Sequence, residues 1–344
     1  MYCLSSAVST RQRIQFTAPG RVEVRTEPRP APADSEVRVR TRYSAVSPGT
    51  ERLVYEGNVP RGLSADASID ALEGDFSYPL SYGYACVGTV EAVGAAVSSD
   101  WKGASVFAFH PHASHFVAAP DALLRLPEET PLRDAVLIPS LETAVTLVMD
   151  GHPLPGASVV VFGQGVVGLL TTALLTRRPL LSVTAVEPVA ERRALAASMG
   201  ARAVASADAL NRNEEAASAA PERADLVYEL TGTPAVLDEA VAQTGYSGRL
   251  VVGSWYGTKR APLDLGGHFH RSRMQIVSSQ VSTIAPRHRG RWTKERRLGV
   301  VVDALSEVQP SRLISDEWAL QDAPALYEKL AEGTSMLQPI FAYD

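Results

Sequence analysis

An apolar run that leads straight into a glycine-rich turn is the feature that most limits what this chain can fold into. The run is Ser158–Phe162, the turn reads Gly163-Gln164-Gly165-Val166-Val167-Gly168, and an apolar stretch through Leu175 follows. This order predicts a buried strand, a tight turn and a helix. In such a turn Gly163 allows the bend, Gly165 the close approach of a ligand and Gly168 the packing of helix on strand. The motif therefore indicates a site for the pyrophosphate of a dinucleotide at the helix N-terminus.

An acidic residue, Glu187, follows the next apolar run, Ser182–Val186. A carboxylate at this place accepts hydrogen bonds from both adenosine ribose hydroxyls and repels a 2′-phosphate, so the sequence favours NAD(H) over NADP(H). Arg192 and Arg193 keep NADP(H) open, because either could reach a 2′-phosphate if Glu187 turned away. In the alternative interpretation the glycines only let a helix pack, and Glu187 is a solvated strand end.

Two different patterns divide the chain near residue 143. Before it, short runs broken by glycine and proline predict a compact, mainly antiparallel β domain. After it, apolar runs alternate with helical segments, which predicts βαβ units, a parallel sheet and an α/β class overall. The first pattern comprises Arg21–Arg25, Glu36–Tyr43, Cys86–Val93, Ala104–Phe109 and Ser114–Ala118. The second comprises strands at Ser158–Phe162, Ser182–Val186, Asp225–Leu230, Arg249–Val252 and Met274–Ser279, with helices at Gly165–Thr176, Ala190–Met199 and Ala235–Ala242. In the tail, Lys294–Leu305 and Ala323–Ala331 are predicted helices and Pro339–Tyr343 a strand that returns to the first domain.

Composition excludes several classes of protein. The 344 residues allow two domains, since a domain usually has about 100–200 residues. Two cysteines, Cys3 and Cys86, exclude a disulfide framework and favour a reducing, cytoplasmic setting. No apolar stretch is long enough to cross a membrane, and a net charge of −5 argues against nucleic acid as the main partner. The class of partner that remains is small molecules.

Further segments follow one another in a fixed order along almost the whole chain. They are Glu36–Tyr43, Ser47-Pro48-Gly49-Thr50-Glu51, Tyr82-Gly83-Tyr84-Ala85-Cys86-Val87-Gly88-Thr89-Val90, Leu141–Leu147, Tyr228-Glu229-Leu230-Thr231-Gly232 and Gly248-Arg249-Leu250-Val251-Val252-Gly253. With the glycine turn and Glu187, this set resembles the medium-chain dehydrogenase/reductase superfamily. The resemblance implies a GroES-like catalytic domain, expected at 1–143 and 283–344, interrupted by a Rossmann doubly wound domain at 144–282.

The resemblance also places cofactor contacts outside the glycine turn. Thr143 is expected against the nicotinamide, and the ends of two parallel strands are expected to border the ligand. The expected cofactor-binding residues are Gly163, Gly165, Val166, Val167, Gly168, Glu187, Arg192, Thr231, Gly232, Gly253, Ser254 and Thr143. Family members commonly pair the edge strand that corresponds to Met274–Ser279 across a two-fold axis, so we expect a homodimer.

The positions that hold zinc in the alcohol dehydrogenases of this superfamily carry other residues here. Pro48 stands at the first ligand cysteine, Tyr84 at the ligand histidine, and Ile138 or Pro139 at the third ligand. None of these side chains is a reasonable zinc ligand, and the four-cysteine structural lobe is missing too. The chain therefore resembles a zinc-free branch. The combination of Gly49-Thr50-Glu51 with an aromatic residue after Gly83 is similar to the bacteriochlorophyllide dehydrogenase group.

Without zinc, a hydrogen-bond donor must stabilise the charge that develops on the substrate oxygen. Thr50 occupies the place of the family's proton-relay hydroxyl, Tyr84 that of the lost histidine, and Glu51 that of the carboxylate that orients it. We expect these three residues to be catalytic, with Tyr84 or Thr50 as donor. The alternative is that Tyr84 is a buried wall aromatic and that Thr50 caps a helix.

Two polar clusters allow more than one interpretation. His110, His112 and His115 could form a metal site or a proton relay, or a surface turn with satisfied side chains, and no metal site is predicted. The basic run from Arg287 to Arg297 could contact an anionic substrate group near Arg287 or Arg289, or be a solvated helix entry.

The sequence therefore predicts a zinc-independent, NAD(H)-dependent oxidoreductase that acts on a carbonyl or secondary alcohol. One alternative is an NADPH-dependent quinone or enone reductase. Another is a dinucleotide-binding sensor or partner protein that has lost catalysis. The segment Asn58–Ser81 is expected to be a long loop or a loop with one short helix, and the resemblance places it beside the substrate.

Overall fold

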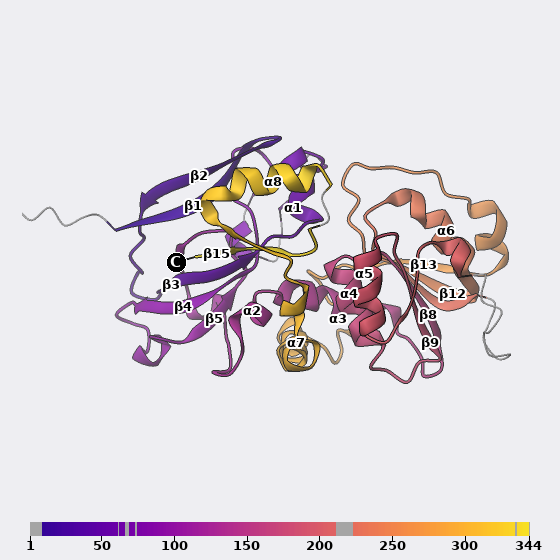
Figure 1. Ribbon diagram of the computed structural model, residues 1–344. Helices are drawn as coiled ribbons and strands as arrows, with labels where there is room; N and C mark the ends of the chain where they lie inside the picture. Colours follow the sequence, from indigo (N-terminus) through magenta and orange to yellow (C-terminus); the bar gives the residue numbers. More distant parts are fainter. Residues whose placement is uncertain are drawn as a thin grey trace, which may run out of the picture. The chain divides into compact units, whose positions relative to one another are not determined.

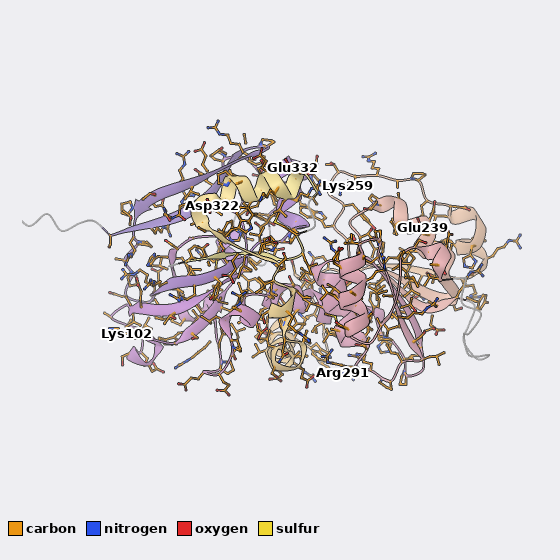
Figure 2. All side chains as sticks on the ribbon, viewed as in Figure 1. Lys102, Glu239, Lys259, Arg291, Asp322 and Glu332 are labelled. Atoms are coloured by element: carbon orange, nitrogen blue, oxygen red, sulfur yellow. The ribbon has the colours of Figure 1, made fainter. Side chains whose placement is uncertain are left out.

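The structure, a computed structural model, describes residues 9–60, 62–65, 69–72, 74–210, 223–333 and 336–343. Cys3 lies outside the described residues. The chain forms two compact units, Met1–Pro139 with Gln309–Asp344, and Ser140–Val308 (Figure 1). No helix in the described ranges is long and apolar enough to cross a membrane. Figure 2 shows that charged side chains such as Lys102, Glu239 and Asp322 lie on the exposed surface of their own unit.

The first unit is built on an antiparallel sheet, as predicted. Its strand order is β14-β15-β3-β4-β5-β7, with β6 also paired to β3, and β1 and β2 form a separate hairpin. Only the β14–β15 pair is parallel among the described pairs of this sheet. The strands are β1 (Thr10–Ala18), β2 (Arg21–Pro28), β3 (Val37–Ala45), β4 (Cys86–Val93), β5 (Ser105–Ala108), β6 (His115–Ala118), β7 (Leu123–Arg125), β14 (Asp316–Ala319) and β15 (Pro339–Ala342).

Short helices complete this unit. They are α1 (Thr50–Glu56), α2 (Leu132–Ala135) and α8 (Ala323–Ala331). Of these, α8 lies beside the hairpin, whereas α2 contacts β3 and β4. The helix α8 contacts α1 and β2, and its buried residues Leu326 and Tyr327 pack with Ile14 and Phe16 of β1. Because β15 pairs with β3, the chain's end returns to the first unit as expected.

The second unit is a doubly wound parallel sheet. Its order is β10-β9-β8-β11-β12-β13, which confirms the Rossmann-type prediction. The elements are α3 (Ile138–Gly151), β8 (Ser158–Phe162), α4 (Val166–Leu175), β9 (Ser182–Val186), α5 (Ala190–Ser198), β10 (Arg202–Val204), β11 (Ala224–Glu229), α6 (Leu237–Gln243), β12 (Thr244–Val252), β13 (Gln275–Ser278) and α7 (Lys294–Val308).

Helices pack on both faces of this parallel sheet. On one face, Val160 and Phe162 of β8 form a cluster with Ala240 of α6. On the other, Gly151 at the end of α3 lies against Tyr228 of β11, because a Cβ at Gly151 would be only 2.0 Å from the Tyr228 hydroxyl. Strands covered on both faces are continuous apolar runs, which is why the sequence predicted β8 and β9 so well.

The division between the units differs from the expected one at its second boundary. We expected residues 283–344 in the first unit, whereas α7 lies in the second, which ends at Val308. The physical reason is Arg297, which is 1% exposed. It donates to the Glu142 carboxylate of α3 at 2.6 Å and to the Val281 carbonyl at 2.7 Å. These buried charge-assisted hydrogen bonds hold α7 to the parallel-sheet unit.

Candidate functional site

The glycine turn between β8 and α4 has the shape that the motif predicted. Gly163 has φ of 86°, and a Cβ there would lie 2.8 Å from the Leu230 backbone. A Cβ at Gly168 would lie 2.0 Å from the Gly163 carbonyl oxygen. Around Gly165, by contrast, no protein atom lies within 4 Å of such a Cβ. Packing thus accounts for Gly163 and Gly168, while Gly165 leaves open space at the N-cap of α4, which suits a pyrophosphate.

Glu187 lies beside this turn and is buried. One carboxylate oxygen accepts from the Gln164 backbone N–H at 2.7 Å, and the other accepts from the Val189 N–H at 3.0 Å. Arg193 donates to the backbone carbonyl of Glu187 at 2.8 Å. The carboxylate therefore ties the glycine turn to the end of β9. Arg192, at the start of α5, is half-buried.

A buried glutamine that the sequence interpretation passed over stabilises the turn from inside. Gln164 is fully buried, and its amide oxygen accepts from the Thr172 hydroxyl at 3.0 Å. Its amide nitrogen donates to the Val161 carbonyl at 3.3 Å. Only the position of Gln164 between two motif glycines could have pointed to it.

The ends of β11 and β12 come together around Glu229, which the sequence interpretation did not single out. Glu229 is fully buried and accepts from the Thr231 N–H at 2.7 Å. Its other carboxylate oxygen accepts from the Tyr256 hydroxyl, and burial together with this carboxylate raises the pKa of Tyr256. Ser254 donates to the Glu229 carbonyl at 3.4 Å and accepts from the Gly232 N–H at 2.9 Å.

Thus Thr231, Gly232 and Ser254, predicted to border the cofactor, lie in one hydrogen-bonded group at the carboxyl end of the sheet. Gly253 continues β12, and a Cβ there would lie 2.6 Å from Leu147 of α3. Thr143, also in α3, is half-buried.

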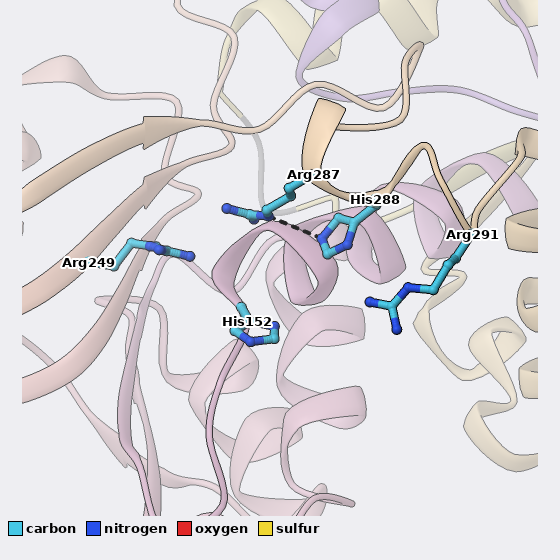
Figure 3. A pocket seen from close by; sticks show the side chains of 5 residues that line it. All are labelled: His152, Arg249, Arg287, His288 and Arg291. Carbon is cyan, nitrogen blue, oxygen red and sulfur yellow. Dashed lines mark hydrogen bonds between the residues drawn. The ribbon is translucent and has the colours of Figure 1, made fainter.

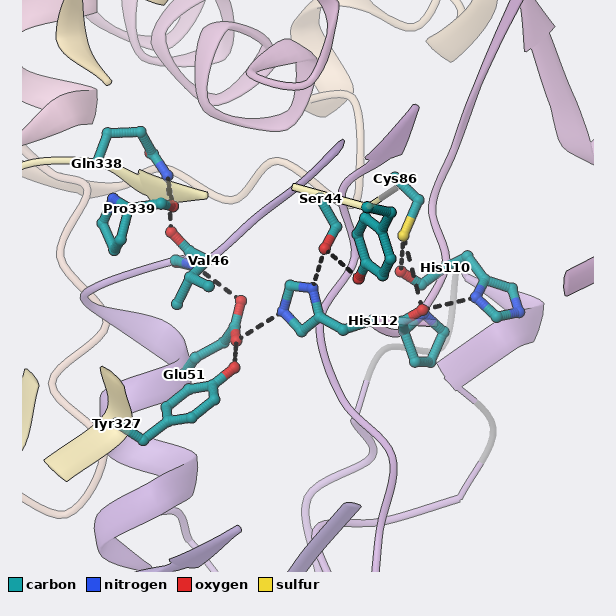
Figure 4. Close-up of polar contacts among 12 residues, drawn as sticks. Ser44, Val46, Glu51, Cys86, His110, His112, Tyr327, Gln338 and Pro339 are labelled. Carbon is teal, nitrogen blue, oxygen red and sulfur yellow. Dashed lines mark hydrogen bonds and ion pairs between the residues drawn. The ribbon is translucent and has the colours of Figure 1, made fainter. Parts of the chain in front are cut away.

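A continuous chain of hydrogen bonds runs through the core of the first unit (Figure 4). Glu51 is fully buried, and one oxygen of its carboxylate accepts from Tyr327 at 2.5 Å and lies 3.0 Å from His112 Nε2. The Nδ1 atom of His112 lies 2.7 Å from Ser44 Oγ, which in turn is 2.8 Å from the Tyr343 hydroxyl.

The hydrogens of this chain fit one arrangement. If Glu51 is ionised and His112 carries its proton on Nε2, then Tyr343 donates to Ser44, Ser44 to His112, and both His112 and Tyr327 to Glu51. Every donor then points toward the single carboxylate. Burial and the Glu51 charge raise the pKa of Tyr327 well above its usual value, which keeps this hydroxyl a donor.

The other oxygen of Glu51 accepts from the Ser47 N–H at 2.8 Å, and the Glu51 N–H donates to the Ser47 carbonyl at 3.0 Å. This pair fixes the loop that precedes α1. Thr50 is the first residue of α1, and Gly49 is the N-cap. The alternative in which Thr50 is the cap is therefore not observed.

Tyr84 is half-buried and packs edge-on against Tyr82, with ring centroids 6.1 Å apart. Among the expected catalytic residues, Glu51 and Thr50 are adjacent in α1, and Tyr84 lies near Tyr327, whose pKa it helps to raise. The sequence interpretation missed Tyr327, Ser44 and Tyr343 as members of this site, and no local pattern marks them.

The residues at the family's zinc positions do not fit a zinc ion. Pro48 and Tyr84 offer no ligand of the usual kind, and Ile138 is fully buried. A Cβ at Gly83 would lie 2.5 Å from the His112 ring, so that ring fills the space above Gly83. His112 itself is bonded on both nitrogens.

Nearby thiol and imidazole groups do not supply a replacement. Burial raises the pKa of the Cys86 thiol, which donates to the His110 carbonyl at 3.2 Å. His110 stacks on Phe116 and has Nδ1 2.7 Å from the Pro111 carbonyl. In the described ranges, no group of three or more His, Cys, Asp and Glu residues is arranged to hold a metal ion. The three histidines of this segment have separate environments.

Comparisons with known proteins agree with this architecture. Residues 166–295 match the family described as zinc-binding dehydrogenase. A D-guloside 3-dehydrogenase of Escherichia coli is 24% identical over 76% of this chain and 79% of its own length. An (R,R)-butanediol dehydrogenase of Bacillus subtilis is 29% identical over 40% of each chain. An alcohol dehydrogenase structure from E. coli CFT073, solved with NADH, superposes with a TM-score of 0.77 at 18% identity, covering 97% of this chain and 100% of that one.

The predicted enzyme class is thereby confirmed, since these relatives are dehydrogenases. In fold, in the family match over residues 166–295 and in its relatives, the chain is similar to zinc-binding dehydrogenases.

Proposed function

We propose that this protein transfers hydride between NAD(H) and a carbonyl or secondary alcohol substrate without a catalytic zinc ion. The observation that carries the proposal is the buried chain of hydrogen bonds around Glu51. In the zinc enzymes, a carboxylate at this position orients a metal ligand; here it accepts hydrogen bonds from Tyr327 and His112. The ligand positions themselves hold Pro48 and Tyr84.

In place of the metal, Tyr84 and Thr50 hold the substrate oxygen. NAD(H), when bound, supplies or accepts the hydride. During reduction the carbonyl oxygen gains negative charge, and a hydroxyl that donates to it lowers the barrier and then gives up its proton. Tyr84 is half-buried, and Thr50 begins the helix that Glu51 anchors.

Glu51 is a positioning residue in this scheme. Its carboxylate holds Ser47 on one side and His112 with Tyr327 on the other. The loop from Ser47 to Thr50 therefore cannot shift without breaking buried charge-assisted hydrogen bonds. This rigidity keeps the Thr50 hydroxyl at one place.

The preference for NAD(H) rests on Glu187. Its carboxylate is held at the glycine turn by the N–H groups of Gln164 and Val189. A 2′-phosphate would meet this negative charge, whereas ribose hydroxyls can donate to it. Arg193 donates to backbone carbonyls of Glu187 and Pro188, so its guanidinium already has partners.

We also propose a homodimer that works in the reducing cytoplasm. The strand β13 ends the parallel sheet, and Ile276 on it is 36% exposed. An edge strand with an apolar side chain is suited to pairing with a second copy. Light scattering should give twice the mass of the chain, and Ile276→Lys should shift the protein to monomer.

Steady-state kinetics on a panel of ketones and enones with NADH and NADPH tests the main proposal. We expect Tyr84→Phe to lower kcat/KM by about 10²-fold or more and Thr50→Val by about tenfold. Tyr246→Phe, at a side chain 72% exposed, is the matched control and should change nothing. Unchanged turnover in both variants would refute the assigned roles. Activity confined to enones with NADPH would favour the reductase alternative, and cofactor binding without turnover would favour a sensor.

A further inference from the structure

A cavity of about 240 Å³ in the second unit is lined by basic side chains (Figure 3). They come from three segments: the end of α3, the strand β12, and the turn before α7. The lining residues are His152, Arg249, Arg287, His288 and Arg291. Figure 3 shows their side chains directed toward one another across the cavity.

Part of this positive charge caps the helix α3. Arg249 donates to the Asp150 carbonyl at 3.2 Å, and Arg287 donates to the Met149 carbonyl at 3.3 Å. His288 Nε2 lies 3.2 Å from the same Met149 oxygen. Cations at a helix C-terminus satisfy its last carbonyl groups and interact favourably with the helix dipole. This role explains Arg249, Arg287 and His288.

Arg291 and His152 are not explained in this way. Within the described ranges, neither side chain makes a hydrogen bond or ion pair with the protein. Asp150 is the only described carboxylate paired with the cluster, 3.6 Å from Arg287, and it also accepts from Ser279 at 2.8 Å. Three guanidinium groups against one carboxylate leave two positive charges in the cavity, even with both histidines neutral.

The cavity lies away from the dinucleotide turn. Arg249 pairs with Leu226, which in turn pairs with Val159 at the start of β8. The glycine turn follows Phe162 at the opposite end of that strand. The three residue steps from Val159 to Phe162 separate the two places by about 10 Å along the sheet. Binding at the cavity is therefore distinct from binding at the turn.

We propose that this cavity binds a small phosphate-bearing anion, such as a phosphate monoester or a pyrophosphate. A guanidinium presents two parallel N–H groups that match two phosphate oxygens, and several arginines around one concave site are typical of phosphate recognition. The net charge of the cluster matches a dianion. The cavity volume of about 240 Å³ suits a small anion.

Calorimetric titration of the full chain with inorganic pyrophosphate at fixed ionic strength tests this site. The informative variant is Arg291→Gln combined with His152→Ala, because neither side chain caps α3 and the fold should be retained. A thermal unfolding curve checks that retention. Arg202→Gln is the matched control, since this exposed arginine lies on β10 at the far edge of the same sheet.

We expect the double variant to bind pyrophosphate at least about tenfold more weakly and the control to bind within about twofold of the wild type. Saturating NADH should leave the affinity unchanged if the two sites are separate. Equal affinity in wild type, variant and control would overturn the proposal. Binding of oligonucleotides but not of pyrophosphate would also overturn it, since it would assign the basic surface to a polymer.

Discussion

Glu51 and His112 lie 61 positions apart in the chain, yet the Glu51 carboxylate is 3.0 Å from His112 Nε2 and both side chains are fully buried. A buried carboxylate is stable only when donors surround it. Here the donors are His112, Tyr327 and the Ser47 N–H.

Replacing Glu51 by glutamine should therefore destabilise the first unit. The NH2 of the glutamine amide would face either the Ser47 N–H or the donors of His112 and Tyr327, so at least one buried donor would lose its acceptor. We expect a loss of about 2–4 kcal/mol in the free energy of unfolding, measured by urea denaturation, and a lower kcat/KM. Glu56→Gln, on the same helix, should cost under about 1 kcal/mol because its pair with Arg52 is partly exposed. Equal losses in the two variants would refute the role of the buried chain.

Replacing Glu187 by glutamine should change the choice of cofactor. The change removes the negative charge that would oppose a 2′-phosphate while it keeps an acceptor for the Gln164 N–H. We expect the ratio of Kd values to shift by about tenfold toward NADPH, or about 1.4 kcal/mol, in fluorescence titrations. Glu191→Gln, at an exposed position of α5, is the control. A wild type that already prefers NADPH would contradict the assignment.

Breaking the Arg297–Glu142 ion pair should lower the free energy of unfolding strongly, whereas replacing both residues by apolar ones should lower it little. Arg297→Met leaves the Glu142 carboxylate buried without its guanidinium, for which we expect a loss of about 3–5 kcal/mol. Adding Glu142→Leu should recover much of that loss, since an apolar pair of similar size leaves no buried charge. Arg296→Met, at an exposed site on the same helix, should have little effect. A double variant no more stable than Arg297→Met would show that the ion pair is not what holds α7.

Stability should fall in mild acid because of His110. Burial lowers the pKa of this side chain to about 4, from 6.5 as the ordinary value. Between these values the unfolded chain binds a proton that the folded chain does not, so the stabilisation is complete above pH 6.5 and is lost as the pH falls toward 4. His115, with its pKa also lowered to about 4 by burial, adds to the trend.

Urea unfolding at pH 7.5 and pH 5 measures this effect. We expect His110→Gln to reduce the difference in unfolding free energy between the two pH values by about 1–2 kcal/mol. His270→Gln, at an exposed side chain, should leave the difference as it is. A pH dependence that His110→Gln does not alter would assign the effect to other groups.

Local patterns were enough to predict most of the parallel-sheet unit. The bounds of β8 and β9 in this unit, and of α8 in the first unit, agree with the expected segments because each is a continuous apolar run or an amphipathic stretch with clear ends. The strands β1 and β14 were missed, since polar residues interrupt them and half of each faces away from the core. Glu187 directly follows β9, as the sequence predicted, because its place depends on that strand alone.

The buried chain of hydrogen bonds around Glu51 could not be predicted in the same way. Ser44 and Tyr343 are 299 positions apart, and Glu51 and Tyr327 are 276 apart. Their contacts depend on β15 returning to pair with β3, which no short motif encodes. For the same reason His112 was grouped with His110 and His115 by sequence proximity, although its partners lie elsewhere.

Zinc content, measured by elemental analysis on catalytically active protein purified without chelator, shows whether the enzyme works without a catalytic zinc ion. We predict far less than one zinc ion per chain and hydride transfer that EDTA does not change. About one zinc ion per chain, with activity that is lost on chelation and restored by zinc, would contradict this prediction.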